Sequence, residues 1–115
     1  MRVVGRHARK LAALGERGAQ VRIGSFQDRT FLADAFRGAR AAFVLTPVDV
    51  SLPDINAEQR RNVLGIAAAI RDAGIGHVVT LSSWGAEVPE GIGGIIACHW
   101  VLLRSYLSAT GNRAA

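Results

Sequence analysis

The sequence has little of several residue types: one cysteine, one tyrosine and one lysine among 115 residues. Cys98 alone cannot form an internal disulfide, which indicates a reducing, cytoplasmic setting. His99 adjoins Cys98, but His7 and His77 lie far from both, so the spacing predicts no metal site. No apolar run approaches the ~20 residues that a membrane span requires, and no apolar signal-peptide segment opens the chain. These absences predict a cytoplasmic protein with neither a metal nor a membrane partner.

The basic charge does not have the pattern of a nucleic-acid interface. The formal net charge is +5, and all basic residues except Lys10 are arginines. They are scattered along the chain without a basic run, and aromatic residues do not alternate with them to stack on bases. We interpret this charge as a solvated surface and expect no nucleic-acid partner, while noting that it suits a phosphate-bearing ligand.

Apolar patterns of strand and helix type alternate along the chain with short connections, which predicts βαβ units and a parallel sheet. The expected strands are residues 2–5, 21–24, 41–46 and 77–81. The expected helices are residues 7–16, a short helix after Asp28, a longer helix that opens at residue 56, and residues 99–109. The fold class is therefore α/β, with helices flanking a parallel sheet in a single domain.

Local signals place the ends of the two central helices. Asp28 is expected to cap the first of them, and Gly38 to end it. The second is expected to begin at Asn56, in a capping box with Gln59 three residues later. The residues of this second helix expected at inward positions are Val63, Leu64, Ala67 and Ile70.

Five segments resemble, in order, those of the NmrA-like branch of the atypical short-chain dehydrogenases. They are residues 3–11, 18–21, 38–47, 57–63 and 77–83. The resemblance implies that residues 1–115 are part of an NAD(P)-binding Rossmann domain that prefers NADP to NAD. It implies an NAD(P)H-dependent oxidoreductase acting on a quinone or a similar small-molecule substrate. The branch also contains regulators that bind the dinucleotide without turning it over, so a redox-sensing module is an alternative. A truncated product without function is a third.

Matched position by position, the resemblance implies a set of cofactor-binding residues. Arg6 follows the family's second strand, where a guanidinium pairs with the 2′-phosphate of NADP, or it is an ordinary solvated residue at a strand end. If Arg6 pairs with the 2′-phosphate, Lys10, one helical turn later, would assist it. The segment beside the adenine begins at Ser25 and Phe26. The segment along the ribose and pyrophosphate is Leu45, Thr46 and Pro47.

The resemblance places candidate catalytic residues after the strand at residues 77–81. Ser82 and Ser83 would lie near the nicotinamide or substrate, with Ser82 also contacting the cofactor, or would satisfy free backbone groups at the strand end. His99 matches a family histidine that faces the cofactor pocket. The Tyr-x-x-x-Lys pair of short-chain dehydrogenases is absent, because Thr110 follows Tyr106 by four residues and Lys10 is the only lysine. Hydride transfer would then depend on the chemistry of the cofactor and on positioning.

The family's first strand and its Gly-x-x-Gly-x-x-Gly turn do not appear in this sequence. In the strand order 3-2-1-4-5 the missing strand is the central one. The strands at residues 2–5 and 41–46 are therefore expected to flank a gap or to pair directly. We expect the isolated chain to be inactive as an enzyme. An internal start codon in a longer gene is one hypothesis for the missing part, and a decayed gene copy is another. Unpaired strand edges also favour homo-oligomers.

Overall fold

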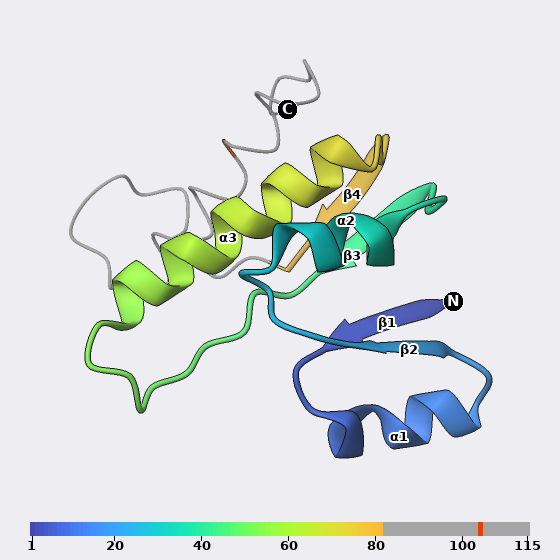
Figure 1. Ribbon diagram of the computed structural model, residues 1–115, viewed down its shortest axis with the longest axis horizontal. Helices are drawn as coiled ribbons and strands as arrows, with labels where there is room; N and C mark the ends of the chain where they lie inside the picture. Colours follow the sequence, from blue (N-terminus) through green and yellow to red (C-terminus); the bar gives the residue numbers. More distant parts are fainter. Residues whose placement is uncertain (82–103, 105–115) are drawn as a thin grey trace.

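The computed structural model describes residues 1–81 and 104, and shows an α/β arrangement of short parallel strands and flanking helices (Figure 1). The strands are β1 (Arg2–Gly5), β2 (Gln20–Ile23), β3 (Ala41–Val44) and β4 (His77–Thr80). The helices are α1 (Ala8–Glu16), α2 (Arg29–Phe36) and α3 (Ile55–Asp72). None of the helices in this described part is long and apolar enough to cross a membrane.

The strands form two separate parallel pairs, β1 with β2 and β3 with β4. Val3 lies opposite Val21 in the first pair, and Phe43 lies opposite Val79 in the second. Figure 1 shows β1 and β3 as the inner strands, with β2 and β4 outside them. Of the two arrangements expected from the sequence, the described residues have the one with a gap, because no ladder joins β1 to β3.

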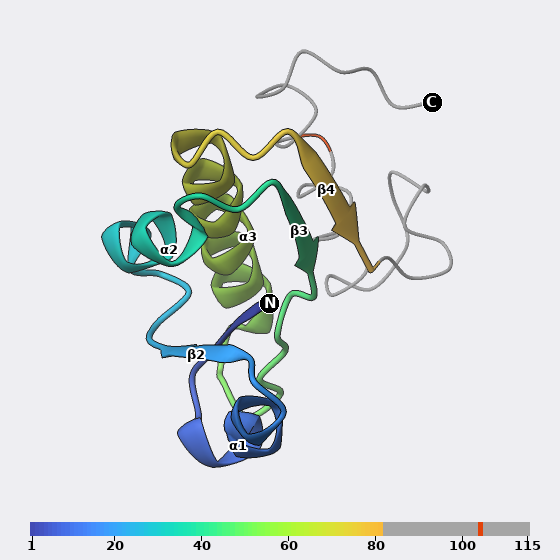
Figure 2. The ribbon, with the colours of Figure 1, turned by 90° about the vertical axis from the view of Figure 1, so that its right-hand side faces the viewer.

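The helices cover the two pairs from different sides. Helix α3 lies over one face of β3 and β4 and packs against α2, whereas α1 packs against β1 and β2 (Figures 1 and 2). The main core lies under α2 and α3, and Val4 of β1 packs against it. Its buried members are Leu32, Val44, Val63, Ile66, Ala67, Ala69, Ile70 and Ile75. The larger hydrophobic cluster therefore belongs to the β3–β4 half.

Two side chains connect distant elements around this core. Arg2 of β1 donates through Nη1 to the carbonyl oxygens of Ala35 (2.6 Å) and Arg37 (3.0 Å), at the end of α2. These bonds satisfy carbonyls that a helix end leaves free. Arg29 of α2 forms an ion pair with Asp72 of α3 at 2.7 Å. The hydrogen bond from Arg29 lowers the pKa of the Asp72 carboxyl, assisted by the charges of Arg29 and Arg71.

The helix ends confirm most of the expected local signals. The Phe31 N–H donates to Asp28 Oδ1 at 2.9 Å, so Asp28 caps α2 as predicted. Gly18, Gly38 and Gly74 follow the three helices with φ values of 91°, 76° and 67°. This left-handed conformation favours glycine, because a Cβ atom makes it strained.

Several expectations were wrong in detail. Strand β2 begins and ends one residue before the expected 21–24, and β4 ends one residue before the expected 77–81. Helix α3 begins at Ile55 and is capped by Asp54, whose Oδ1 accepts from the Ala57 N–H at 2.9 Å; Asn56 lies in the first turn instead. Strand β3 ends at Val44, two residues before the expected end. Leu64 is 43% exposed, because the buried face of α3 is centred on Val63, Ile66 and Ile70.

The cap at Asp54 predicts a stability difference between two neighbouring residues. Asp54→Ala is expected to lower the free energy of unfolding by about 1 kcal/mol, because the Ala57 N–H loses its partner. Asn56→Ala is expected to change it by less than about 0.5 kcal/mol, because Asn56 is exposed on the first turn. Urea unfolding followed by far-UV circular dichroism measures both. If Asn56→Ala lowers the free energy of unfolding more than Asp54→Ala does, Asn56 is the cap of the helix, as the sequence predicted.

Candidate functional site

The loops that follow β1, β2 and β3 leave the strands on the same side, at their carboxyl ends (Figure 1). In parallel α/β sheets this edge is where ligands bind. Arg6 follows β1, Ser25 and Phe26 follow β2, and Leu45 to Pro47 follow β3. The expected cofactor-binding residues within residues 1–81 thus lie in the loops and first helical turn at one edge of the strands.

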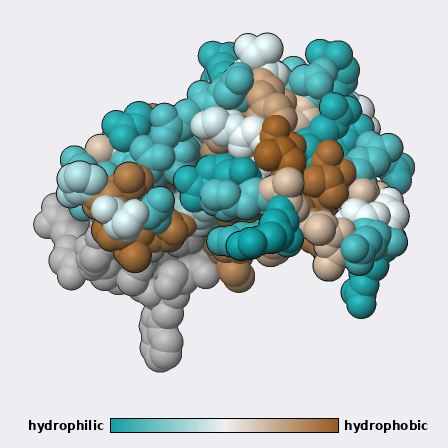
Figure 3. Space-filling model, turned by 60° about the horizontal axis from the view of Figure 1, so that its bottom comes forward, coloured by the Kyte–Doolittle hydropathy of each residue, from teal (hydrophilic) through white to brown (hydrophobic). Residues whose placement is uncertain are grey.

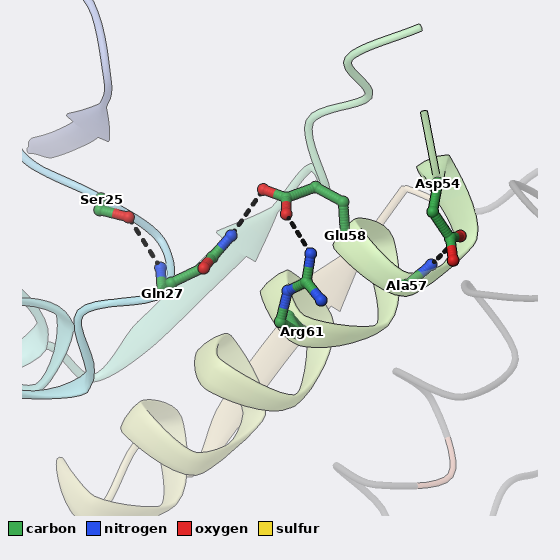
Figure 4. A network of polar contacts seen from close by, with 6 residues as sticks. All are labelled: Ser25, Gln27, Asp54, Ala57, Glu58 and Arg61. Atoms are coloured by element: carbon green, nitrogen blue, oxygen red, sulfur yellow. Dashed lines mark hydrogen bonds and ion pairs between the residues drawn. The ribbon is translucent and has the colours of Figure 1, made fainter. Parts of the chain in front are cut away.

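The loop after β2 is tied to α3 by a chain of polar contacts (Figure 4). The Ser25 hydroxyl accepts from the Gln27 N–H at 3.2 Å, which closes a small turn. The Gln27 amide nitrogen donates to Glu58 Oε1 at 2.6 Å, and Arg61 donates to the other Glu58 oxygen at 2.9 Å. The Ser25 to Gln27 segment therefore has a fixed position relative to the first turns of α3.

The same loop lies against the backbone of α3. A Cβ atom at Gly65 would come within 2.8 Å of the Phe26 carbonyl oxygen. Only a residue without a side chain permits this approach. Phe26 is half-buried and its side chain packs on the main core, while Ser25 is exposed. Of the two predicted adenine-side residues, Ser25 is thus accessible to a ligand and Phe26 partly structural.

Polar side chains are buried where β3 and β4 end. Thr46 is only 5% exposed, and its hydroxyl has no hydrogen-bond partner within the described residues; the Thr80 hydroxyl shares this property. Gln59 of α3 is also buried and donates to the Pro47 carbonyl oxygen at 2.7 Å. A buried hydroxyl without a partner is unfavourable. The two threonine hydroxyls are therefore buried polar groups at this edge that a hydrogen bond to a water molecule or a ligand would stabilise.

Arg6 is exposed and is expected to contact an anion. Among the described carboxylates none forms an ion pair with it. Its positive charge does act on Asp49, in the loop between β3 and α3. The pKa of the Asp49 carboxyl is lowered chiefly by the hydrogen bond from the Ser51 hydroxyl (2.6 Å), then by the Ser51 N–H (3.1 Å); Arg6 adds to this and partial burial opposes it. Lys10 is exposed in the first turn of α1.

The predicted catalytic residues Ser82, Ser83 and His99 lie outside the described residues, as does the expected helix at 99–109 apart from Arg104, which is helical. Strand β4 ends at Thr80, just before the serine pair. Within the described part of the chain, no group of three or more His, Cys, Asp or Glu side chains is placed to hold a metal ion.

Sequence reasoning missed several residues at this edge. Gln27, Glu58 and Asp49 were not singled out, and Gln59 was assigned only to a capping box. Gln27 and Glu58 are 31 residues apart, and no local pattern pairs them. Thr80 was included only as part of a strand. Its position two residues after Val78, on the same half-buried face at the end of β4, was the signal that could have found it.

Comparison with known proteins identifies the fold. No family model matches the chain, and no curated protein is similar in sequence. Solved structures do match. A triphenylmethane reductase from Citrobacter sp., complexed with NADP(H), has a TM-score of 0.79 at 21% identity. The match covers 94% of this chain and 36% of that one.

Two further solved structures have a similar fold. The NADPH-dependent quinone oxidoreductase QOR2 from Escherichia coli, complexed with NADPH, matches with a TM-score of 0.72 and 19% identity over 96% of this chain. The protein Pen from Bacillus thuringiensis matches with a TM-score of 0.73 and 20% identity over 94% of this chain. The match covers 36% of each of these proteins. The chain has a partial Rossmann fold. It spans about a third of the length of the reductases that it resembles.

Proposed function

We propose that this chain is part of the NADP(H)-binding domain of an NmrA-like, NAD(P)H-dependent reductase whose substrate is a quinone or a similar small molecule. One observation carries the proposal. The residues expected to bind the dinucleotide all follow strands at one edge of a partial Rossmann fold, in the loops and the first helical turn: Arg6, Lys10, Ser25, Phe26, Leu45, Thr46 and Pro47. Two similar structures are complexes with NADP(H) or NADPH. A cytoplasmic setting belongs to the proposal and is supported by the single cysteine.

The residues at this edge fit the parts of NADP that they would meet. The exposed Arg6 guanidinium can bind the 2′-phosphate with two parallel hydrogen bonds. Thr46 and Thr80 offer hydroxyls that lack partners within the described residues. The bound dinucleotide supplies the hydride. The chain's own residues would hold and orient it, with Ser82, Ser83 and His99 as the proposed contacts near the reacting carbon.

A calorimetric titration of the full chain with NADPH, and with NADH for comparison, tests the proposal. We expect saturable binding that is tighter for NADPH. Arg6→Gln is expected to weaken NADPH binding by about 10- to 100-fold, because a charge-assisted contact of about 1.5–3 kcal/mol is lost. NADH binding is expected to stay the same, because it has no 2′-phosphate.

Arg40 provides the matched control. It is an exposed arginine that precedes β3, at the amino ends of the strands. Arg40→Gln removes the same charge and is expected to leave both titrations unchanged. Equal losses from the two variants would assign the effect to net charge. Folded wild-type chain that binds neither nucleotide would refute dinucleotide binding by this chain. Detectable oxidation of NADPH with a quinone acceptor would favour a reductase over a dinucleotide sensor, and would overturn the expectation that the isolated chain is inactive.

A further inference from the structure

A buried amide holds the segment that follows β3. Gln59 of α3 is 2% exposed, although hydrophilic side chains form most of the surface seen in Figure 3. Its neighbours on the buried face of the helix, Val63 and Ile66, are apolar. A buried amide is unfavourable unless it is hydrogen-bonded. The Gln59 amide nitrogen donates to the Pro47 carbonyl oxygen at 2.7 Å, and this bond ties residues 45–47 to α3.

The residue before Gln59 holds the other loop. Glu58 accepts from the Gln27 side chain at 2.6 Å, and Arg61 donates to the second Glu58 oxygen at 2.9 Å, which orients the carboxylate (Figure 4). Successive residues of an α-helix point about 100° apart, because a turn has about 3.6 residues. Glu58 and Gln59 therefore reach two different loops from adjacent positions on one helix.

We propose that Glu58 and Gln59 are positioning residues of the dinucleotide site, each for a different part of the ligand. The inference rests on the proposed function, under which Ser25 and Phe26 lie beside the adenine and residues 45–47 along the ribose and pyrophosphate. Glu58 then positions the loop at the adenine end, and Gln59 positions the segment along the pyrophosphate. Neither side chain needs to touch the nucleotide, because each holds a loop that does.

The segment after β3 needs such an anchor because it has no regular structure of its own. Residues 45–54 lie in neither a helix nor a strand. Ordering a free loop when a ligand binds opposes affinity, and a loop that is already held in place avoids that cost. Loss of an anchor is therefore expected to weaken the ligand even though no contact with the ligand is removed.

Calorimetric titrations of the full chain with NADPH and with adenosine 2′,5′-bisphosphate, which has only the adenine end, test the two assignments. Gln59→Met removes the donor and keeps an unbranched side chain at the buried position. We expect it to weaken NADPH binding by about tenfold and to change bisphosphate binding by less than about twofold. Glu58→Met is expected to weaken both ligands by about tenfold. Glu58→Gln removes the same charge but keeps an acceptor oxygen for Gln27, so it is expected to retain most of the affinity.

NMR order parameters of the backbone amides, measured without nucleotide, show whether the anchors hold the loops. We expect the values at Thr46 and Val48 to fall from about 0.85 toward about 0.6 in Gln59→Met. Ile66→Val is the control for stability, because it trims a buried side chain of the same helix that touches neither anchor bond. It is expected to lower stability by a similar amount and to leave the order parameters and both affinities unchanged.

Three results would overturn the positioning roles. The first is unchanged order parameters in Gln59→Met, whether or not a nucleotide binds. The second is a loss of NADPH affinity in Gln59→Met no larger than that in Ile66→Val. The third is an equal loss of bisphosphate affinity in Gln59→Met and Glu58→Met. Folded wild-type chain that binds neither nucleotide would refute the proposed function and, with it, the positioning roles, while the order parameters would still decide whether Gln59 anchors the segment after β3.

Discussion

Leu32→Ala is expected to lower the free energy of unfolding by about 2–5 kcal/mol. Leu32 lies on α2 and has no exposed surface, and its neighbours in the main core come from α3, β3 and the turn before β4. Truncation removes apolar atoms from this contact and leaves a cavity between α2 and α3. Because whole domains are stable by only about 5–15 kcal/mol, the loss is a large share of the total.

Leu64→Ala is the control for this measurement. It makes the same chemical change, but Leu64 is 43% exposed on the outer side of α3. We expect a loss below about 1 kcal/mol, measured by urea unfolding under identical conditions. Similar losses at the two positions would show that the α2–α3 contact contributes less to stability than its burial indicates.

The contrast between these leucines shows what periodicity can predict. Repeats of three and four residues correctly placed Val63, Ala67 and Ile70 on the buried face of α3. They also admitted Leu64, because a broad apolar stripe at helical spacing does not mark its own centre. The centre is set by the two elements that contact the helix, namely α2 and the β3–β4 pair, and that information is tertiary. Capping signals have a similar limit: Asp54 and Asn56 are both good cap residues, and the preceding chain decides between them.

The candidate site was partly predictable for a different reason. Parallel strands bring the loops at their carboxyl ends together, so correct strand assignment was enough to gather Arg6, Ser25 and Thr46 at one edge. The contacts that fix these loops were not predictable. The hydrogen bonds of Gln27 with Glu58 and of Gln59 with the Pro47 carbonyl join residues 31 and 12 positions apart. They depend on the distance between α3 and the loops, which no local pattern encodes.

Gly65→Ala is expected to be destabilising, because α3 lies close to the loop after β2 at this position. A change from glycine to alanine normally stabilises a helix interior by up to about 1 kcal/mol. The added Cβ atom would lie 2.8 Å from the Phe26 carbonyl oxygen. Because a backbone carbonyl cannot rotate away as a side chain can, either α3 or the loop after β2 must move. We expect a net loss of about 1–3 kcal/mol in the free energy of unfolding, the usual range for overpacking.

Gly15→Ala is the matched comparison, since Gly15 also lies inside a helix. A Cβ atom there would lie 3.2 Å from a methyl group of Val21, which is a side chain able to shift slightly. Gly15→Ala is therefore expected to be neutral or stabilising, and thermal unfolding of both variants compares them directly. The Gly65 variant should also weaken NADPH binding relative to Gly15→Ala, because the Ser25 segment moves with the loop. A Gly65→Ala variant as stable as the unmodified chain would mean that α3 and this loop are not held together as closely as the carbonyl contact requires.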